Sequence, residues 1–261
     1  MTKPRTGLLA GKQVRRLGFG TMRLTGPGIW GPPASEAEAV HLLRKAVELG
    51  VQHIDTADAY GPNVAEGIIR KALYPYADEL IIATKGGFTR QGPGKWAPCG
   101  FPAYLRQCVE MSLRHLNVEA IDLYYLHRVD PNIPLADQVG ELERMRQEGK
   151  IKSLGLSKVD IPQLAQAMAI TPIAAVQNQF SILDHQSEDV IRWCEHNKIA
   201  FVPYTPLSAG KYFATSQVQQ APASANDALK WLLDYSPIMF PIPGTSRFEH
   251  LEENLRSDNV C

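Results

Sequence analysis

The segment "SEAEAVHLLRKAVELGVQHIDT", residues 35–56, changes its hydrophobic period once along its length. Ser35 followed by Glu38 is the pattern of a helix N-terminal capping box, and apolar residues then recur at helical spacing up to Gly50. The next six residues, 51–56, form a short apolar run that is typical of a buried β-strand. The segment therefore predicts an α-helix over 35–50 that leads directly into a strand.

The same alternation extends over most of the chain. Several of the apolar runs are apolar nearly throughout, as expected for strands of a parallel sheet that is covered on both faces. Eight strand-like runs are found, at residues 15–21, 51–56, 79–85, 121–127, 151–157, 174–180, 199–207 and 239–245. Helical spacing is found at residues 35–50, 102–117, 134–150, 187–198, 226–235 and 247–256.

Eight strand–helix units in about 250 residues predict a (β/α)8 TIM barrel of the α/β class, as a single domain over residues 1–261. An open, doubly wound sheet is the alternative. If it bound a dinucleotide, it would be expected to carry a G-x-G-x-x-G turn after its first strand. "LGFGTMRLTGPG", residues 17–28, does not have that spacing before a helix. The Gly- and Pro-rich segment 26–33 is predicted to be a loop over the mouth of the barrel.

Composition and charge exclude several classes of protein. The 27 basic and 27 acidic side chains give no net charge, so nothing favours nucleic acid or an anionic membrane as the main partner. No apolar run approaches the roughly 20 residues of a membrane-spanning helix, and the N-terminus lacks the pattern of a secretion signal, so we expect a cytoplasmic protein. No metal site or disulfide framework is indicated by the spacing of the four cysteines, Cys99, Cys108, Cys194 and Cys261.

Polar side chains follow three consecutive runs at the point where each run ends. Asp55 and Tyr60 lie in "HIDTADAYG", residues 53–61, Lys85 ends the third run, and His127 ends the fourth. In a (β/α)8 barrel the active site lies at the C-terminal ends of the strands. We therefore expect a carboxylate, a phenol, an ammonium group and an imidazole to converge there.

The chemistry of these four groups is mutually consistent. Lys85 beside Tyr60 would lower the pKa of the phenol from about 10, which would help it donate a proton to a developing alkoxide. Asp55 can pair with Lys85, because an unpaired buried carboxylate is costly. His127 can orient a carbonyl oxygen by hydrogen bonding. None of the four groups donates electrons, so reduction of a carbonyl would need a hydride cofactor.

The chain resembles the aldo-keto reductase family from about residue 14 to 256. The motifs that carry the resemblance are "GFGTMRL", "HIDTADAYG", "IIATKGG", "DLYYLH", "GLSK", "VQNQFS", "PYTPL" and "PIPGTSRFEHLEENL". The resemblance implies a barrel that binds NADPH and reduces aldehydes and ketones. It implies Tyr60 as general acid, Lys85 as the group that tunes its pKa, Asp55 as the partner of Lys85, and His127 as the residue that orients the substrate.

The resemblance also implies a set of cofactor-binding residues. Ser157, Gln177 and Asn178 match positions around the nicotinamide amide, and Tyr204 matches the aromatic residue that stacks on the nicotinamide ring. The family usually has Asn after this serine, but this chain has Lys158, which cannot accept a hydrogen bond. The pyrophosphate loop corresponds to Pro206, Leu207, Ser208 and Gly210.

The phosphate end of the cofactor is expected at the last helix. A helix N-terminus binds phosphate through its free N–H groups, and Arg247 would add a charged partner, which favours NADPH over NADH. The residues that open this helix are Gly244, Thr245, Ser246 and Arg247. Family positions near the 2′-phosphate and the adenine are matched by His250, Glu253 and Asn254.

The substrate is indicated less specifically. Trp30, Trp96 and Arg128 lie near the predicted barrel mouth and are candidates for substrate contact, whereas Asp58 is predicted to be a solvent-exposed loop acid. The resemblance is strongest to a bacterial subgroup that includes pyridoxal reductases, so an aldehyde on an aromatic ring is one candidate and a natural-product carbonyl another. Because family members usually continue beyond the position of Cys261, we expect an open pocket.

Two alternatives to a carbonyl reductase follow from the same resemblance. The family includes NADPH-binding regulatory subunits of potassium channels, which act mainly by binding partners. A reductase-like lyase or isomerase without net turnover of the cofactor is the other alternative. We expect a monomer that acts on a small carbonyl compound.

Overall fold

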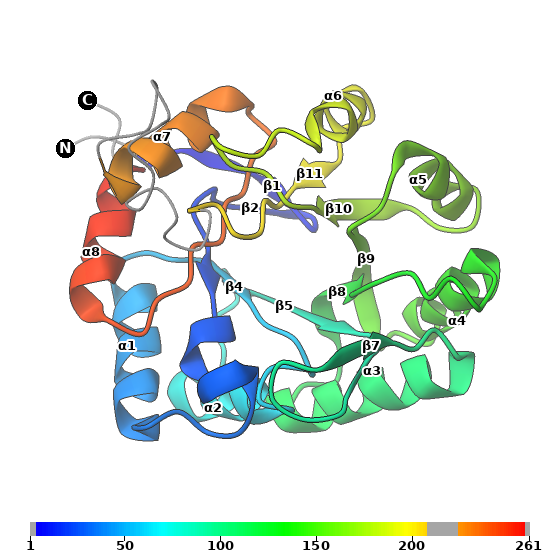
Figure 1. The fold of residues 1–261 in the computed structure, drawn as a ribbon, viewed down its shortest axis with the longest axis horizontal. Helices are drawn as coiled ribbons and strands as arrows, with labels where there is room; N and C mark the ends of the chain where they lie inside the picture. The colour runs from blue at the N-terminus through cyan, green and yellow to red at the C-terminus, as the bar shows by residue number, and fades with distance from the viewer. Residues whose placement is uncertain (1–3, 208–223, 259–261) are drawn as a thin grey trace.

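The computed structural model describes residues 4–207 and 224–258, so the predictions for Ser208, Gly210 and Cys261 concern residues outside the described part. A curled sheet of seven parallel strands lies at the centre, in the order β11-β10-β9-β8-β5-β4-β3 (Figure 1). These strands are β3 (Phe19–Gly20), β4 (His53–Asp55), β5 (Ile81–Gly86), β8 (Ile121–Leu126), β9 (Ile151–Ser157), β10 (Ile173–Gln177) and β11 (Ala200–Phe201).

The eighth apolar run, residues 239–245, closes the sheet into a barrel. Phe240 donates its backbone N–H to Phe201 of β11 at 2.8 Å, and Gly20 of β3 donates to the carbonyl of Pro243 at 3.1 Å. The prolines of this run have no N–H to donate in return, so the run makes fewer ladder hydrogen bonds than a regular strand. The predicted (β/α)8 barrel is confirmed, with an eighth strand position that bonds β3 only through its carbonyls.

In the described part of the chain eight α-helices are formed, and Figure 1 shows helices around the outside of the sheet. Six of them match the predicted helical segments, whereas α2 and α5 were not predicted. Asp160 and Gln163 form a complete capping box at the start of α5, which is a signal that the sequence contains. The helices are α1 (Glu36–Glu48), α2 (Val64–Leu73), α3 (Pro102–Leu116), α4 (Leu135–Gln147), α5 (Ile161–Met168), α6 (Glu188–His196), α7 (Ala225–Tyr235) and α8 (Phe248–Arg256).

The termini of α1 follow the expected pattern. The hydroxyl of Ser35 accepts a hydrogen bond from the backbone N–H of Glu38 at 3.2 Å, which is the first half of a capping box. Gly50 lies just beyond the C-terminal end and has a φ of +93°, a conformation that glycine adopts without steric cost. Ser35 therefore marks where α1 begins, and Gly50 marks where the chain leaves it toward β4.

A hairpin covers the N-terminal end of the barrel. It consists of β1 (Thr6–Leu9) and β2 (Lys12–Arg15), which pair antiparallel. Leu9 and Val14 of this hairpin are fully buried and pack against the inward-facing side chains of the barrel. The interior is therefore a filled core at this end, and the polar strand ends lie at the opposite rim.

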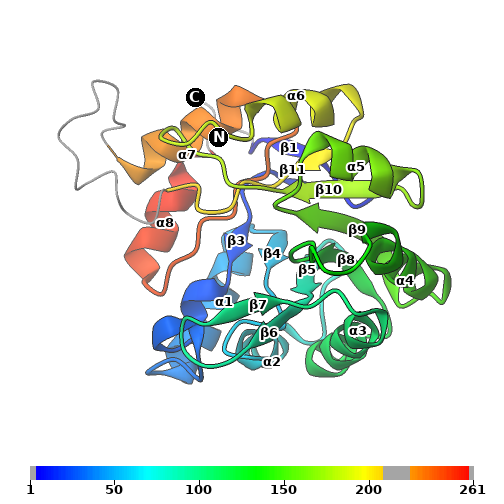
Figure 2. The same cartoon turned by 45° about the vertical axis from the view of Figure 1, so that its right-hand side comes forward.

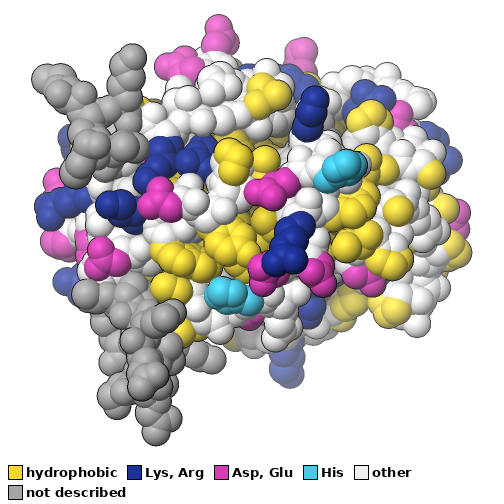
Figure 3. Space-filling model, turned by 90° about the horizontal axis from the view of Figure 1, so that it is seen from above, with side chains coloured by type: hydrophobic (Ala, Val, Ile, Leu, Met, Phe, Trp, Pro, Cys, Tyr) yellow, Lys and Arg dark blue, Asp and Glu magenta, His cyan; other side chains and the backbone are white. Residues whose placement is uncertain are grey.

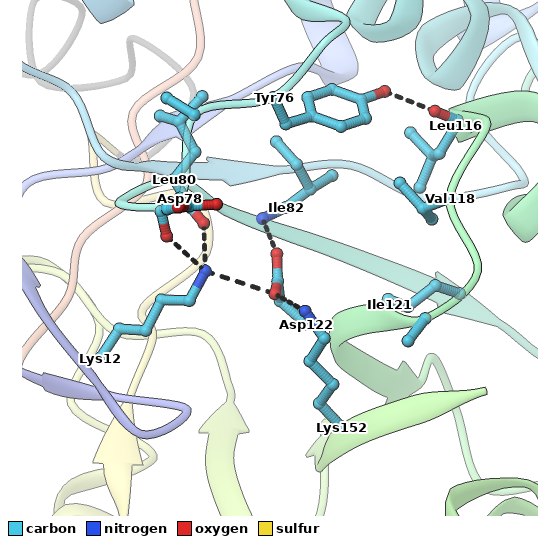
Figure 4. A pocket seen from close by; sticks show the side chains of 12 residues that line it. Lys12, Tyr76, Asp78, Leu80, Ile82, Leu116, Val118, Ile121, Asp122 and Lys152 are labelled. Atoms are coloured by element: carbon cyan, nitrogen blue, oxygen red, sulfur yellow. Dashed lines mark hydrogen bonds and ion pairs between the residues drawn. The ribbon is translucent and has the colours of Figure 1, made fainter. Parts of the chain in front are cut away.

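A small cleft of about 190 Å³ lies beside this hairpin, and Figure 4 shows its polar contacts. Asp122 at the start of β8 accepts a hydrogen bond from the backbone N–H of Ile82 at 3.2 Å, and it forms an ion pair with Lys152 at 2.9 Å. Lys12 of the hairpin reaches the same carboxylate at 3.4 Å. One carboxylate thus ties β2, β5, β8 and β9 together below the barrel.

Replacement of Asp122 by Ala is expected to lower the free energy of unfolding by about 1–2 kcal/mol, because it leaves the N–H of Ile82 without its acceptor. Asp122→Asn keeps an acceptor oxygen and should lose clearly less. Urea denaturation of the two variants measures the difference. Equal losses in both would show that the ion pairs, and not the hydrogen bond to Ile82, carry the stabilisation.

The outer surface mixes charges of both signs. Figure 3 shows one face on which basic and acidic side chains alternate around exposed hydrophobic side chains. Within the part of the chain that the structure describes, no helix combines the length and the hydropathy needed to cross a bilayer.

Candidate active site

Asp55 and Lys85 form a buried ion pair at the rim where the strands end. Lys85 Nζ lies 2.6 Å from Asp55 Oδ1, and it also donates to the carbonyl of Thr56 at 2.6 Å. The two side chains are 2% and 0% exposed. The prediction that the buried acid meets a cation is confirmed. Because β4 and β5 are adjacent parallel strands, residues at their C-terminal ends point into the same end of the barrel.

Tyr60 lies beside this pair, on the loop that follows β4. Lys85 Nζ is 5.2 Å from the centre of the Tyr60 ring. The ring of Tyr60 also packs edge-on against His127, with 6.0 Å between the two ring centres. The carboxylate, ammonium group, phenol and imidazole therefore converge as predicted.

The predicted lowering of the phenol pKa is wrong for this structure. Burial raises the pKa of Tyr60 above its ordinary value of 10, because the phenolate would lose its hydration, and this outweighs the lowering by Lys85. Burial also opposes the charge on Lys85, but Asp55 and Tyr60 raise the pKa of that ammonium group above its usual value. At neutral pH Tyr60 thus holds its proton beside a charged lysine.

His127 follows β8 and is neutral. Burial lowers its pKa well below 6.5, and the positive charges of Lys85, Arg128 and Arg90 lower it further. Its Nδ1 is buried and has no hydrogen-bond partner among the described residues. A neutral imidazole carries one N–H, which can donate a hydrogen bond without releasing a proton.

Gln177 has a role that the sequence reasoning missed. It ends β10, and its side-chain Nε2 donates to Asp55 Oδ2 at 2.8 Å. Asp55 therefore receives Lys85 on one oxygen and Gln177 on the other. The next residue, Asn178, holds the turn after β9. Its side-chain Oδ1 accepts a hydrogen bond from the N–H of Val159 at 3.1 Å, and its Nδ2 donates to the carbonyl of Val159 at 2.8 Å.

A cavity of about 790 Å³ opens next to these groups, and most of the predicted site residues line it. Lys85 is not part of the lining, because it lies fully buried behind it. The predicted catalytic and substrate residues in the lining are Asp55, Tyr60, Trp96, His127 and Arg128. The predicted cofactor residues in the lining are Ser157, Gln177, Tyr204, Pro206, Leu207, Gly244, Thr245, His250, Glu253 and Asn254.

Two predicted site residues are not among those that line this cavity. The backbone of Trp30 bridges to Gly61, so Ile29 lines the cavity while the neighbouring Trp30 is 37% exposed. Lys158 has a φ of +54°, and this turn leaves Ser157 in the lining and its own side chain in solvent. Contacts of Trp30 with the substrate and of Lys158 with the cofactor stay predictions, since neither residue lines the cavity.

Ser246 and Arg247 also lie outside the lining, in an exposed segment before α8. Arg247 is the N-cap residue of that helix, and its Nε lies 3.7 Å from the carboxylate of Glu249. Its side chain is 66% exposed. A contact of these two residues with a phosphate stays a prediction.

Further lining residues were not singled out from the sequence. They come from the end of β3 and from the loops that follow other strands, and the motif "GFGTMRL" contains four of them, Gly20 included. They include Thr21, Met22, Arg23, Ile29, Phe88 and Thr205. Their position after strand ends was the signal that could have found them.

Asp58 is buried, contrary to its prediction as a solvent-exposed acid. It is 8% exposed, and its Oδ1 has no hydrogen-bond partner among the described residues. Burial raises its pKa to about 8, and the nearby carboxylate of Glu66 on α2 raises it as well. The loop after β4 folds inward under α2 and α3, which a short polar segment does not reveal.

The chain is similar to known proteins over most of its length. The model of the Aldo/keto reductase family matches residues 16–228. An uncharacterised oxidoreductase of Schizosaccharomyces pombe is 45% identical over 253 residues, which cover 95% of this chain and 82% of that protein. Pyridoxine 4-dehydrogenase of Escherichia coli is 40% identical over 266 residues, covering 98% of this chain and 93% of that enzyme.

Solved structures show the same fold. An aldo-keto reductase from Bacillus halodurans superposes with a TM-score of 0.84 at 24% identity, covering 99% of this chain and 92% of that one. An aldo-keto reductase from Klebsiella pneumoniae in complex with NADPH has a TM-score of 0.82 at 24% identity, covering 99% and 90%. The family match and the close relatives confirm the resemblance read from the motifs: this chain belongs to the aldo/keto reductase family.

Proposed function

We propose that the protein is an NADPH-dependent oxidoreductase that reduces an aldehyde or ketone to an alcohol, with Tyr60 as the general acid. The observation that carries this proposal is the position of Lys85, which contacts Asp55 at 2.6 Å and lies 5.2 Å from the Tyr60 ring centre at the edge of a large cavity. This arrangement supplies a proton donor, but no side chain in it supplies electrons.

The cavity fits a nicotinamide cofactor. Its volume of about 790 Å³ lies within the range of small-molecule and cofactor sites. Two buried polar atoms of lining residues, His127 Nδ1 and Thr205 Oγ1, have no partner among the described residues and are available to a ligand. Ser157, Tyr204 and Thr245 would hold the cofactor. A related reductase of known structure, named above, is in complex with NADPH.

Each side chain has a distinct part in the reaction. NADPH, when bound, supplies the hydride to the carbonyl carbon. Tyr60 gives its proton to the carbonyl oxygen, and neutral His127 donates a hydrogen bond to the same oxygen. Lys85 stabilises the phenolate that remains, while Asp55 fixes the ammonium group and Gln177 fixes Asp55. The reverse reaction, oxidation of an alcohol, uses the same groups.

The substrate side of the cavity is aromatic. Tyr60, Phe88, Trp96 and His127 pack edge-to-face, with ring centres 4.7–6.4 Å apart. Flat rings favour such surroundings. Together with the relative named pyridoxine 4-dehydrogenase, this supports an aldehyde on an aromatic ring as the substrate class. Arg128, which donates to Ser157 Oγ at 2.9 Å, is the candidate residue for binding a polar substituent of the substrate.

Two measurements on one preparation test this function. The first follows NADPH consumption with a panel of aldehydes that includes pyridine-ring and aliphatic members, and the second titrates NADPH binding. Binding together with consumption of NADPH is expected. Binding without consumption by any aldehyde would contradict the reductase and favour a regulatory NADPH-binding protein or a lyase or isomerase without net turnover.

A further inference from the structure

A second arginine organises the wall of the cavity from outside. Arg90 ends β6 (Phe88–Arg90), which pairs antiparallel with β7 (Trp96–Pro98) in a hairpin separate from the barrel sheet. Figure 2 shows this hairpin on the α2 and α3 side of the barrel. Arg90 faces Trp96 across the hairpin. Neither the proposed reaction nor the family resemblance assigned Arg90 a role.

All five N–H donors of the Arg90 side chain are used, and every acceptor is a backbone carbonyl. Nε donates to Lys95 at 3.0 Å and one Nη2 hydrogen to Gly92 at 3.5 Å, both within the hairpin turn. Nη2 also donates to Gly28 at 3.1 Å. Nη1 donates to Ile29 at 2.8 Å and to Ala59. Ala59 directly precedes Tyr60.

These acceptors belong to three different segments. One is the hairpin turn, one is the loop at residues 26–31, and one is the loop that carries Tyr60. Among the residues that the structure describes, Arg90 makes no ion pair. The guanidinium therefore acts through its fixed fork of five donors and not mainly through its charge, and a lysine with three donors on one nitrogen cannot reproduce that pattern.

The flat face of the same guanidinium covers Trp96. Arg90 Cζ lies 3.6 Å from the centre of the indole ring, which is direct stacking. Trp96 in turn packs edge-on against Tyr60 and against His127, with 6.4 Å between ring centres in both cases. Arg90 thus reaches the proposed proton donor along two routes, through the carbonyl of Ala59 and through the indole of Trp96.

We propose that Arg90 is a positioning residue that holds the aromatic wall of the carbonyl subsite in place before substrate arrives. The inference rests on the proposed reductase function, because it concerns the subsite of the carbonyl group. Arg90 contacts none of the lining residues assigned to the cofactor. Its loss should therefore weaken productive binding of the carbonyl compound and leave cofactor binding unchanged.

The kinetic test compares Arg90→Lys and Arg90→Met with the wild type. The control is Arg192→Lys, which alters an exposed arginine paired with Glu188 on α6. Both Arg90 variants should lose about 10- to 100-fold in kcat/KM for an aromatic aldehyde, mostly through KM, and less for a linear aliphatic aldehyde. The Kd for NADPH should stay within about twofold of the wild-type value.

A second measurement does not depend on activity. Amide hydrogen exchange of peptides that cover residues 26–31 and 88–98 should become at least about tenfold faster in Arg90→Lys, because several charge-assisted hydrogen bonds are lost. Exchange in residues 121–127 of the barrel should not change. A wild type that reduces no aldehyde would refute the proposed function. The exchange measurement would still test whether Arg90 holds these segments together.

Three results would overturn the inference. Wild-type kcat/KM in Arg90→Lys would show that charge alone suffices. Unchanged exchange in both peptides would show that Arg90 does not hold the segments. A loss of NADPH affinity as large as the loss in kcat/KM would show a general disturbance of the barrel rim in place of a positioned carbonyl subsite.

Discussion

Tyr60→Phe is expected to lower kcat for carbonyl reduction by about 10²–10⁴-fold while the Kd for NADPH changes little. The variant keeps the ring that packs against Trp96 and His127 and removes only the hydroxyl. The acceptor oxygen then has no acid within reach, although His127 can still donate a hydrogen bond. Because burial keeps the pKa of the phenol high, the wild type holds this proton throughout the neutral range.

Tyr76→Phe is the matched control for loss of a phenolic hydroxyl. Tyr76 lies at the opposite end of the barrel, where its hydroxyl donates to the carbonyl of Leu116 at 2.7 Å (Figure 4). That variant should lose about 1 kcal/mol of stability and keep its kinetics. Stopped-flow turnover and an NADPH titration measure both variants. Turnover of Tyr60→Phe within threefold of the wild type would refute the assignment of Tyr60 as the acid.

Asp58→Asn is expected to change strongly how stability depends on pH. The pKa of Asp58 is about 8 in the folded protein and 3.8 in its ordinary setting, so the folded state binds this proton more tightly. The contribution of Asp58 to stability is therefore fully present below about pH 4 and falls as pH rises to about 8. Above pH 8 the buried carboxylate should cost up to about 5 kcal/mol, and Asn, which does not ionise, avoids that cost.

Urea denaturation at pH 5 and at pH 9 measures this effect. Asp58→Asn should be more stable than the wild type at pH 9, with a clearly smaller difference at pH 5. The groups that act on the carboxyl of Asp58 are Glu66 on α2, Cys108 on α3, the backbone N–H of Ala59 and Lys85. Parallel stability curves for the two proteins across this pH range would refute the assigned burial cost.

Asp130→Asn serves as a control of opposite sign. Asp130 is also buried, but it accepts a hydrogen bond from the N–H of Gly100 at 2.9 Å and another from the N–H of Asn132. These bonds lower its pKa, so its contribution is present at neutral pH and is lost on acidification. Its replacement should therefore destabilise the protein at neutral pH, where Asp58→Asn stabilises it.

The barrel and the catalytic group could be predicted because both depend on local order. The alternation of runs indicates strands and helices, and in a barrel Asp55, Lys85 and His127 meet simply because each ends a strand. The start of α5 could also have been found, since Asp160 and Gln163 form a recognisable capping box. The eighth apolar run has the sequence pattern of a regular strand. It bonds only partly, because two of its residues are prolines and have no N–H group.

Burial could not be predicted for single loop residues. Asp58 and Tyr60 lie in the same short polar segment, and tertiary packing removes both from water: Asp58 faces Glu66 of α2 and Cys108 of α3, and Tyr60 packs against Trp96 and His127. That packing reverses the expected sign of the Tyr60 pKa shift and makes Asp58 a costly charge. The contact of Gln177 with Asp55 joins residues 122 positions apart and leaves no local signal.

The prolines of residues 239–245 weaken the hydrogen bonding between this run and β3, where the barrel closes. The backbone N–H of Gly20 donates to the carbonyl of Pro243, but Pro243 has no N–H to donate a hydrogen bond back to β3. Thermal opening of the cylinder should therefore start here and not between β5 and β8. Gly20 and Gly244 lie on the two sides of this junction, and both line the large cavity. A long ligand that contacts both sides would therefore raise the melting temperature when it binds.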